Sequence, residues 1–286
     1  MNPRVTVLML TFNRPQFISR AVESIRRQTL QDWELIVVHD GPNEEIAAIL
    51  GEWERKEPRV RYFRRLEKGN IAQANNYGLQ RAQGRYVAVL DDDDYWSEPD
   101  KLEKQVRFLE ENPEYVACGG GAITIDPQGR ELLRYLKPET PEEIEKVALV
   151  ANPMVHSTTM YRLESARQVG FYDESLAGFQ DWDLFLKLGR AGKLRNFPVH
   201  WLYYQIWEGG GSFQAQRGNT QSAVRIVRRH GTHYRGYPVA LTMAVMYYLY
   251  ARLPVGIKKI TFSSLSRLKK AFFSVRKAAD GSESSV

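Results

Sequence analysis

The first 125 residues alternate apolar, β-branched runs with segments whose apolar residues recur every three to four positions. Runs at 4–10, 33–38 and 85–90 are the strongest strand candidates, and segments with helical spacing separate them. A chain that alternates strands with helices builds a mostly parallel central sheet with helices on both faces. The pattern therefore predicts an α/β domain of Rossmann-like type.

The remaining elements follow from the same two periodicities. Shorter strands are predicted at 60–63 and 115–125, and an extended segment at 151–161. Helices are predicted at 15–28, 44–57, 71–82, 99–111 and 181–191. The composition changes after residue 214, so we expect an enzyme domain at 1–214 and a helical, basic tail at 215–286.

Polar residues stand directly after three of the predicted strands. Thr11, Asp40 and Asp91 occupy these positions. In open α/β sheets, ligands bind outside the carboxyl ends of the strands. We therefore expect these three residues to lie on one rim of the sheet, where a ligand binds.

Four adjacent aspartates, residues 91–94, follow the apolar run YVAVL and are the strongest functional signal in the chain. Adjacent carboxylates repel one another, so such a loop destabilises a fold unless something compensates its charge. Mg²⁺ and Mn²⁺ prefer carboxylate oxygens together with substrate phosphates. The run predicts a divalent-metal site, with a solvated acidic loop or a helix N-cap as the structural alternatives.

Five segments, in this order, resemble the family-two inverting glycosyltransferases of the GT-A fold, of the non-processive bacterial type. They are VTVLMLTFNRP, WELIVVHDGP, GNIAQANNYGLQRAQGRYVAVLDDDDYW, NPMVHSTTMYR and GFQDWDLFLKL. The resemblance spans roughly residues 4–212. It implies a GT-A fold and a metal-dependent transfer of a sugar, with Mn²⁺ or Mg²⁺ as cofactor. The donor would be a nucleotide sugar, with a UDP-sugar favoured, and the acceptor a hydroxyl of a glycan or a lipid-linked glycan.

The same resemblance assigns roles at the strand ends. Asp40 would accept a hydrogen bond from the imide N–H of uracil or thymine, Asp91 would contact the ribose, and Asp93 would coordinate the metal. The register within the aspartate run is open, so Asp92 and Asp94 are alternatives. The full nucleotide-binding set is Thr11, Asn13, Arg14, Asp40, Asn76, Asp91 and Asp92.

Asp181 is the candidate general base, at a predicted helix start. The family usually has Glu-Asp at this point, whereas this chain has Gln180-Asp181. Glutamine cannot take a proton, so Asp181 carries the role, with Asp183 as a rival and an N-cap aspartate as the structural alternative. On the acceptor side, Trp182 would stack on a sugar or pack in the core. His156 would touch the acceptor or be a structural histidine.

Two further departures from the family pattern concern the site. Asn75 stands where many members have arginine, and Trp207 stands where a histidine that helps to hold metal or diphosphate is expected. The departures at Gln180 and Trp207 leave a degenerate domain, which binds a sugar nucleotide or lipid without turnover, as one alternative. A sugar nucleotidyltransferase is another, although it would have a Gly-rich basic loop after the first strand, where this chain has TFNRP. A processive synthase is disfavoured because the Gln-x-x-Arg-Trp motif does not occur.

The basic character of the chain belongs to the tail. Of the 40 lysines and arginines, 13 follow residue 214, together with only two of the 34 acidic residues. An uncharged apolar run at 236–251 is shorter than the roughly 20 residues that span a bilayer. After it, an apolar stripe alternates with lysines and arginines, which favours peripheral binding to an anionic membrane. The alternative is a helical hairpin that packs on the domain or on a second subunit. Nucleic acid is not expected as a partner, because it would not explain the aspartates.

The N-terminal sequence and the cysteine content bear on where in the cell the protein is expected. The N-terminal apolar run is short and lacks a cleavage site, so it is a poor signal peptide. Cys118 is the only cysteine, which excludes an internal disulfide and a cysteine zinc site. We expect a cytoplasmic enzyme, peripheral at the inner face of the cell membrane, that helps to build a cell-envelope glycan.

Overall fold

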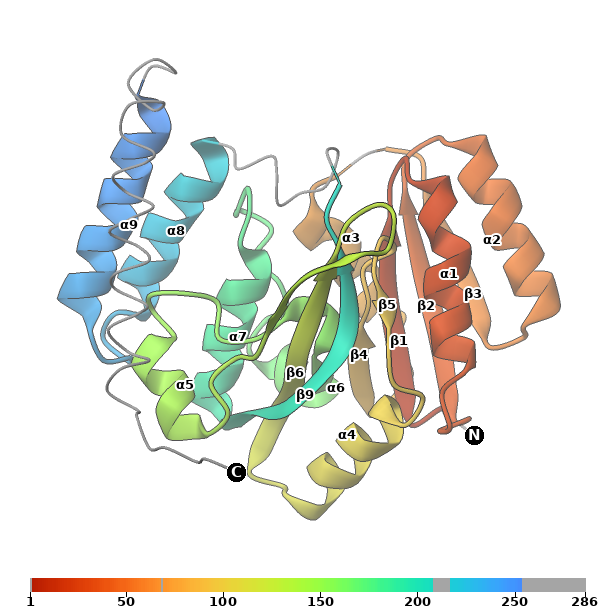
Figure 1. Ribbon diagram of the computed structural model, residues 1–286, viewed down its shortest axis with the longest axis horizontal. Helices are drawn as coiled ribbons and strands as arrows, with labels where there is room; N and C mark the ends of the chain where they lie inside the picture. Colours follow the sequence, from red (N-terminus) through yellow and green to blue (C-terminus); the bar gives the residue numbers. More distant parts are fainter. Residues whose placement is uncertain (1, 68, 208–216, 254–286) are drawn as a thin grey trace.

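The computed structural model describes residues 2–67, 69–207 and 217–253. The strands are β1 Val5–Thr11, β2 Trp33–Asp40, β3 Val60–Arg65, β4 Tyr86–Val89, β5 Tyr95–Trp96, β6 Tyr115–Ile125, β7 Glu131–Tyr135, β8 Met160–Arg162 and β9 Lys193–Gln205. The helices are α1 Pro15–Arg26, α2 Glu44–Lys56, α3 Ile71–Leu79, α4 Lys101–Glu111, α5 Pro141–Val147, α6 Leu163–Gln168, α7 Gln180–Ala191, α8 Arg217–His230 and α9 Tyr237–Arg252, with one 3₁₀ helix, η1 His156–Thr158. Figure 1 shows a twisted sheet through the middle of the molecule, with α1 and α2 at one end and α8 and α9 at the other.

All these strands belong to one sheet. Its order is β3-β2-β1-β4-β8-β6-β9-β5, and β7 pairs with β6. The strands from β3 to β4 are mutually parallel. Beyond them β8 is antiparallel to both β4 and β6, whereas β6 and β9 are parallel. The predicted α/β class is confirmed, with a parallel half that carries the predicted rim and a mixed half beyond it.

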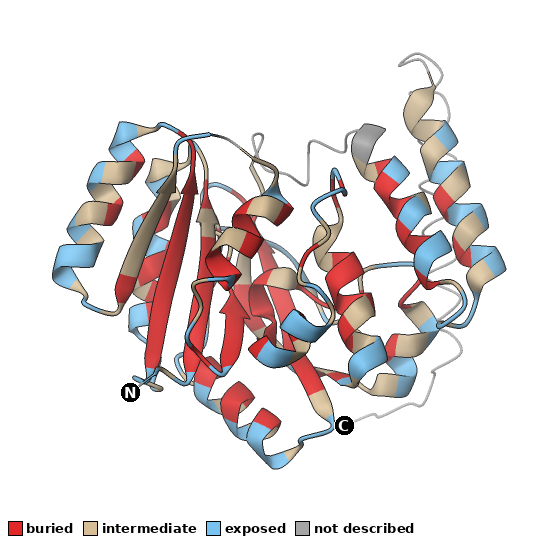
Figure 2. Ribbon diagram, turned by 180° about the vertical axis from the view of Figure 1, so that it is seen from behind, coloured by how far each residue is buried: buried red, intermediate tan, exposed pale blue. Residues whose placement is uncertain are grey.

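Alternate residues of the parallel strands enter two separate cores. Val5 and Val7 face the cluster formed with α1, α2 and α4. Leu8 and Ile36 face the opposite cluster, formed with α3, α6 and α7. Because both faces are covered, β1, β2 and β4 are buried along almost their whole length, as the red ribbons of Figure 2 show, whereas the edge strand β3 is mostly half-buried. This explains why the strands are continuous apolar runs in the sequence.

The segment predicted to be extended at 151–161 is mostly not a strand. It contains η1 and only the first residues of β8. The hydroxyls of Thr158 and Thr159 both donate to the carbonyl oxygen of Val155, at 2.8 and 2.9 Å. Such local bonds from threonine compete with sheet pairing and turn the backbone.

The sequence did not predict β9 either. Arg195, Asn196 and Pro198 interrupt its apolar pattern, and the register between β6 and β9 shifts at Gly119–Gly121. The pairing of β9 with β6 therefore depends on contacts that no local pattern reveals.

The first part of the tail packs on the domain. Helices α8 and α9 share a buried cluster with α7, in which Ile226 and Val227 meet Trp182 and Leu186. A division of the chain at residue 214 would cut through this cluster, so the two-part organisation remains a prediction from composition. The apolar and basic stripe after Pro254 lies outside the described residues. Among the residues that the structure describes, no helix is long and apolar enough to cross a membrane.

One buried cation stands out in the core. Lys101 is fully buried at the start of α4. Its Nζ donates to Oε1 of Gln105 at 2.7 Å and lies 4.0 Å from the centre of the Trp96 ring. Burial lowers the pKa of Lys101 to about 7, and the nearby Cys118 opposes this only in part.

We expect this lysine to make the free energy of unfolding depend on pH. In the unfolded chain Lys101 keeps its proton up to about pH 10, whereas in the folded protein its pKa is about 7. Between these values the unfolded state binds more protons, so Lys101 makes the folded state more stable as the pH rises. Lys101→Met should remove this contribution, which urea unfolding near pH 7 and near pH 9.5 measures. Lys104→Met, at a half-buried position on the same helix where the lysine pairs with Asp100, is the control. An equal slope in both variants would contradict the assignment.

Candidate active site

The carboxyl ends of β1, β2 and β4 meet at one rim of the sheet. Thr11, at the end of β1, pairs in register with His39, and Asp40 follows at the end of β2. The N–H of Leu90 still bonds to β1, and Asp91 follows it directly. The structure therefore brings the three strand ends together, as the order of strands and helices predicted.

Asp40 forms one wall of this rim. Its carboxylate is buried and accepts the backbone N–H of Gly69, at 3.2 and 3.3 Å. The guanidinium of Arg65 lies 3.2 Å from Oδ1. Gly69 precedes Asn70, the N-cap of α3, so Asp40 holds the loop before α3 against the end of β2. A nucleobase imide would add one more donor to this carboxylate.

The two asparagines predicted to bind the nucleotide, Asn13 and Asn76, lie in different surroundings. Asn76 is buried, and its amide bonds to the backbone of Tyr172 in both directions, at 3.0 Å each. It also donates to Glu174, so Asn76 ties α3 to the loop that leads to α7. Asn13 is exposed with a φ of 52° and faces Asn43 across 3.4 Å. Asn13 therefore lies at the rim, whereas the polar atoms of Asn76 are used within the protein.

Neighbouring groups compensate the negative charge of the aspartate run. Arg14 bridges two of its members: its guanidinium lies 2.6 Å from Asp92 and 2.6 Å from Asp93. The indole N–H of Trp207 also donates to Asp93, at 3.0 Å. Asp94 is buried and accepts the backbone N–H of Gln205 at 3.2 Å. Burial raises the pKa of Asp92 to about 7, although Arg14 opposes this.

Asp91 faces η1. It accepts a hydrogen bond from the hydroxyl of Ser157 at 3.0 Å and lies 3.6 Å from Nδ1 of His156. Burial alone would raise the pKa of Asp91, but His156 and Ser157 lower it below its ordinary value. Burial would lower the pKa of His156, but Asp91 raises it above its ordinary value. The pair therefore favours an ionised carboxylate beside a charged imidazole.

These carboxylates can take part in a metal site without completing one. Among the described residues, no group of three His, Cys, Asp or Glu side chains is placed to hold a metal ion. Mg²⁺ is commonly bound by one or two carboxylates plus substrate phosphates. Asp91 and Asp93, of which Asp91 is the more exposed, fit that mode.

Asp181 lies near enough to His156 for its charge to act on that imidazole. It is the second residue of α7, whose N-cap is Phe179, so the N-cap alternative does not hold. Its Oδ2 accepts a hydrogen bond from Nδ2 of Asn152 at 2.6 Å. Its charge adds to that of Asp91 in raising the pKa of His156. Both carboxylates therefore act on the charge of one histidine.

The neighbours of Asp181 on α7 are turned into the protein. Trp182 is buried and donates its indole N–H to the carbonyl oxygen of Ala148 at 2.6 Å, so it packs in the core and does not stack on a sugar. Asp183 is fully buried, 2.9 Å from both Arg229 and His230 of α8. Asp183 is therefore not accessible to an acceptor, because helical geometry sends it to a different side of α7 from Asp181.

Several residues of this site were not anticipated from the sequence. They are Arg20, Arg65, Lys137, Asn152, Ser157 and Tyr172. Ser157 follows His156 directly and could have been found from that adjacency. Asn152 and Lys137 carry no local signal, since their partners are distant in the sequence. Trp207, at the expected histidine position, bonds to Asp93 and packs on Phe17, with ring centres 5.4 Å apart.

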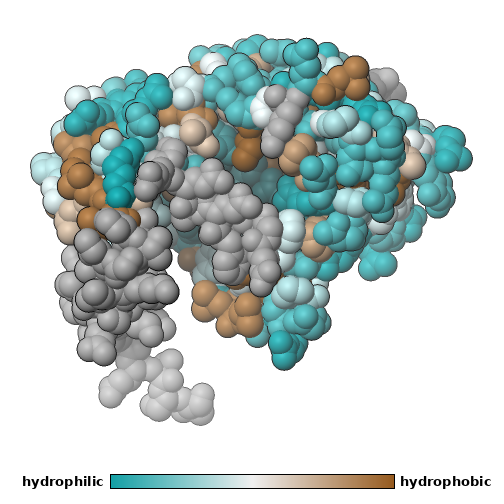
Figure 3. Space-filling model, turned by 90° about the horizontal axis from the view of Figure 1, so that it is seen from above, coloured by the Kyte–Doolittle hydropathy of each residue, from teal (hydrophilic) through white to brown (hydrophobic). Residues whose placement is uncertain are grey.

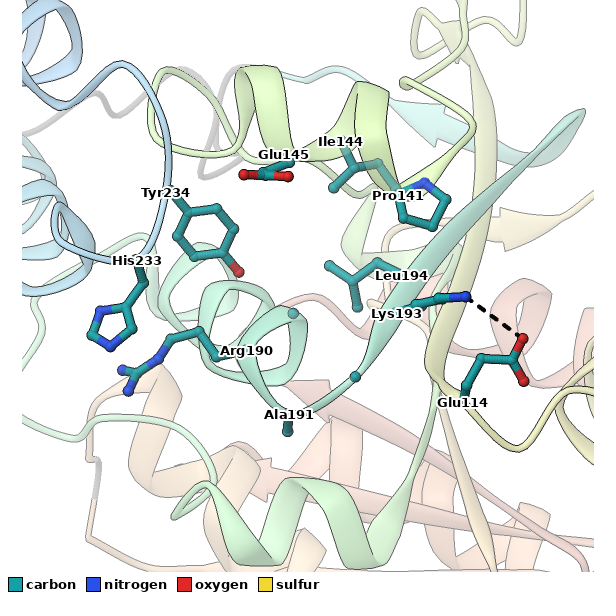
Figure 4. Close-up of a pocket in the computed structure, with 12 residues that line it drawn as sticks. Glu114, Pro141, Ile144, Glu145, Arg190, Ala191, Lys193, Leu194, His233 and Tyr234 are labelled. Atoms are coloured by element: carbon teal, nitrogen blue, oxygen red, sulfur yellow. Dashed lines mark ion pairs between the residues drawn. The ribbon is translucent and has the colours of Figure 1, made fainter.

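A cavity of about 780 Å³ lies elsewhere, between α5, the end of α7, the start of β9 and the α8–α9 turn (Figure 4). Its charged lining is partly paired internally: Lys193 lies 3.8 Å from Glu114. The cavity lies at the carboxyl end of α7, whereas Asp181 lies at the start of that helix. It is therefore separate from the rim.

Known proteins resemble this chain over the part that contains the rim. The family model described as "Glycosyl transferase family 2" matches residues 6–170. The amylovoran biosynthesis glycosyltransferase AmsE of Erwinia amylovora is 32% identical over 198 residues, which cover 68% of this chain and 73% of AmsE. The uncharacterized glycosyltransferase MJ1057 of Methanocaldococcus jannaschii is 31% identical, covering 65% of this chain and 64% of that protein. Chondroitin synthase of Pasteurella multocida is 27% identical, and the match spans only 20% of its length.

Two solved structures resemble the fold. S. aureus TarS 1–349 in complex with UDP-GlcNAc has a TM-score of 0.65 at 17% identity, covering 87% of this chain and 72% of that one. The mannosyltransferase PcManGT from Pyrobaculum calidifontis, in complex with GDP-Man and Mn²⁺, has a TM-score of 0.63 at 17% identity, covering 93% and 80%. At these identities the likeness shows the fold alone, which is the predicted GT-A fold.

The two aspartates of α7 should respond differently to mutation. Asp183→Asn leaves Arg229 and Lys187 beside a neutral group, and the loss of buried hydrogen bonds to a charged carboxylate costs about 1.5–3 kcal/mol of unfolding free energy. Asp181→Asn keeps a bond to Asn152 and should change stability by less than about 1 kcal/mol. Urea unfolding of both variants measures this. Equal stability of the two would contradict the burial described for Asp183.

Proposed function

Because this chain belongs to glycosyl transferase family 2, we propose that it transfers a sugar from a nucleoside-diphosphate sugar to an acceptor hydroxyl with inversion at the anomeric carbon. The observation that supports the proposal is that Asp40 and the aspartate run follow strands that end at one rim, and that Asp181 is close enough to His156, the neighbour of Asp91, to act on its charge. The nucleotide would lie over the ends of β1 and β2. The acceptor would approach from the side of α7.

The donor assignment depends on Asp40. A carboxylate at the base position accepts well from the imide N–H of uracil or thymine, whereas cytosine has no imide. We therefore propose UDP-sugars, with dTDP-sugars as the second choice. The similar structures support nucleotide-sugar binding in general, since one holds UDP-GlcNAc and the other GDP-Man.

The metal assignment depends on Asp93. Bound Mn²⁺ or Mg²⁺ would neutralise the charge that develops on the diphosphate leaving group. Asp93 would hold the metal and Asp91 the ribose, with Asp92 kept as a buried partner of Arg14. A structure similar in fold was solved with Mn²⁺, which supports this choice.

The catalytic step depends on Asp181. Its carboxylate would accept the proton of the acceptor hydroxyl as the oxygen attacks the anomeric carbon and the bond to the diphosphate breaks. A single displacement inverts that centre. His156, whose charge responds to both Asp91 and Asp181, would lie where donor and acceptor meet.

Asp181→Asn tests the base. The variant should bind UDP like the wild type and lose about 10²–10⁴-fold in kcat, because a positioned base contributes about that much. Transfer to acceptor measured beside UDP calorimetry separates the two effects. A variant with near wild-type turnover would show that another group takes the proton.

Asp93→Ala tests the metal and the donor together. We expect UDP affinity to depend on Mn²⁺ in the wild type and to lose that dependence in the variant, while the fold survives. Calorimetry with UDP, GDP and CMP, each with Mn²⁺ and with chelator, measures it. Asp100→Ala, whose carboxylate pairs with Lys104, is the control. Equal UDP affinity in chelator would refute the metal role, and preference for GDP or CMP would refute the role of Asp40.

We further propose that the enzyme is peripheral at the inner face of the cell membrane and meets a lipid-linked acceptor in cell-envelope glycan synthesis. Helix α9 presents an apolar face: Val239, Met243, Met246, Tyr247 and Leu249 are 41–58% exposed. Figure 3 shows hydrophobic side chains gathered at the left, where α9 lies in Figure 1. The printed name of AmsE, amylovoran biosynthesis glycosyltransferase, supports a role in polysaccharide synthesis.

Vesicle co-sedimentation tests this surface. The full chain should pellet with anionic vesicles and much less with neutral ones, since each nearby lysine or arginine contributes about 1 kcal/mol. Replacing Met243, Met246 and Leu249 by serine should reduce pelleting, as should ending the chain after Leu253. Leu132→Ser with Leu133→Ser, exposed on β7, is the control. Equal pelleting with both vesicle types would refute the proposal, and loss of an oligomer in the α9 variant would point to a second subunit.

A further inference from the structure

Asn152 lies against the first turn of α7, in a segment without regular structure. Its side chain reaches Asp181, 29 positions further along the chain, with Nδ2 2.6 Å from Oδ2. One oxygen of the Asp181 carboxylate is therefore engaged before any acceptor arrives. No hydrogen bond from a described residue engages the other oxygen, Oδ1.

The amide of Asn152 can face only one way. The backbone N–H of Met154 donates to its Oδ1 at 3.2 Å. A backbone N–H cannot accept, so the carbonyl oxygen of the amide must lie on that side. The NH₂ group then necessarily faces Asp181, and it meets a carboxylate that can only accept when ionised.

The segment that carries Asn152 is held from two further directions. Nζ of Lys137, between β7 and α5, donates to the carbonyl oxygen of Asn152 at 2.8 Å. Asn196 of β9 donates to the carbonyl oxygen of the next residue, Pro153, at 3.0 Å. Because both neighbouring elements bind the backbone here, the amide is preformed and does not depend on α7 for its position.

We propose that Asn152 is a positioning residue, which holds Oδ2 of Asp181 so that Oδ1 is directed at the acceptor hydroxyl. The inference rests on the proposed role of Asp181 as the base. A single donor to one carboxylate oxygen restricts rotation about the side chain, so that the other oxygen keeps one direction. Asn152 acts through Asp181 and needs no contact with substrate.

Two variants separate positioning from packing. Asn152→Ala removes the donor and should lower kcat by about 10–10²-fold, as misdirected groups do, with little change in donor KM. Asn152→Asp keeps the acceptor for Met154 but places a second carboxylate beside Asp181. Two carboxylates that share a site raise the pKa of one of them. The acidic limb of the pH profile of kcat/KM should therefore move to higher pH in Asn152→Asp. At pH values above this limb, the variant should regain part of its activity.

The other charged or titratable groups that face Asp181 are the same in every variant. They are Lys137 from the β7–α5 segment, His156 from η1 and Tyr172 from the loop before α7. A move of the acidic limb in Asn152→Asp is thus attributable to the new carboxylate. A merely structural role for Asn152 would lower stability without moving the pH profile.

The decisive measurement is a double-mutant cycle by single-turnover transfer. If Asn152 acts through the base, Asn152→Ala should cause no further loss in the Asp181→Asn background. UDP calorimetry verifies that each variant is folded, and Asn112→Ala, whose amide bonds only to its own helix, is the matched control. Wild-type kcat in Asn152→Ala, an unmoved profile in Asn152→Asp, or equal losses in both backgrounds would overturn the inference. Near wild-type turnover in Asp181→Asn alone would instead overturn the proposed base.

Discussion

The four carboxylates at the end of β4 constrain everything around them. Such a run, largely buried at a sheet rim, is stable only if each charge meets a partner. The partners come from separate parts of the chain: Arg14 follows β1, Ser157 belongs to η1 and Gln205 ends β9. Compensation of one loop therefore ties the parallel half of the sheet to the mixed half. The residues that stabilise the loop are also those that surround the proposed donor site.

Helix α7 likewise carries carboxylates whose charges all meet partners. The helix faces the rim with Asp181 and the interior with Asp183, and both aspartates are bonded. Asp183 holds α7 to α8 through a buried network with Arg229 and His230. The helix that would supply the base is thus anchored on the face opposite the chemistry. Electrostatic groups that need no reorganisation during the reaction are the most effective ones, and this anchoring provides that condition.

The packing of α8 and α9 changes how the tail is understood. Composition alone separates it from the enzyme domain, yet Ile226 and Val227 complete a core with Trp182. A truncation at residue 215 would expose that core and confuse a loss of folding with a loss of membrane binding. The outward apolar face of α9 is a distinct feature, because Ala240 and Ala244 on the inward face make the contact with the domain. Membrane binding and packing are therefore compatible within one helix pair.

The sequence by itself determined the alternation of strands and helices, the α/β class, the strand-end positions of Thr11, Asp40 and Asp91, and the family. These follow from local periodicity and from motifs whose residues are close together in the chain. Only the tertiary structure decided which side chains of each motif face the rim. It placed Asn76, Trp182 and Asp183 inside the protein and brought Asn152 to Asp181. The physical reason is that these contacts join residues from 29 to almost 100 positions apart in the chain. A local sequence pattern does not show which distant segments pack together.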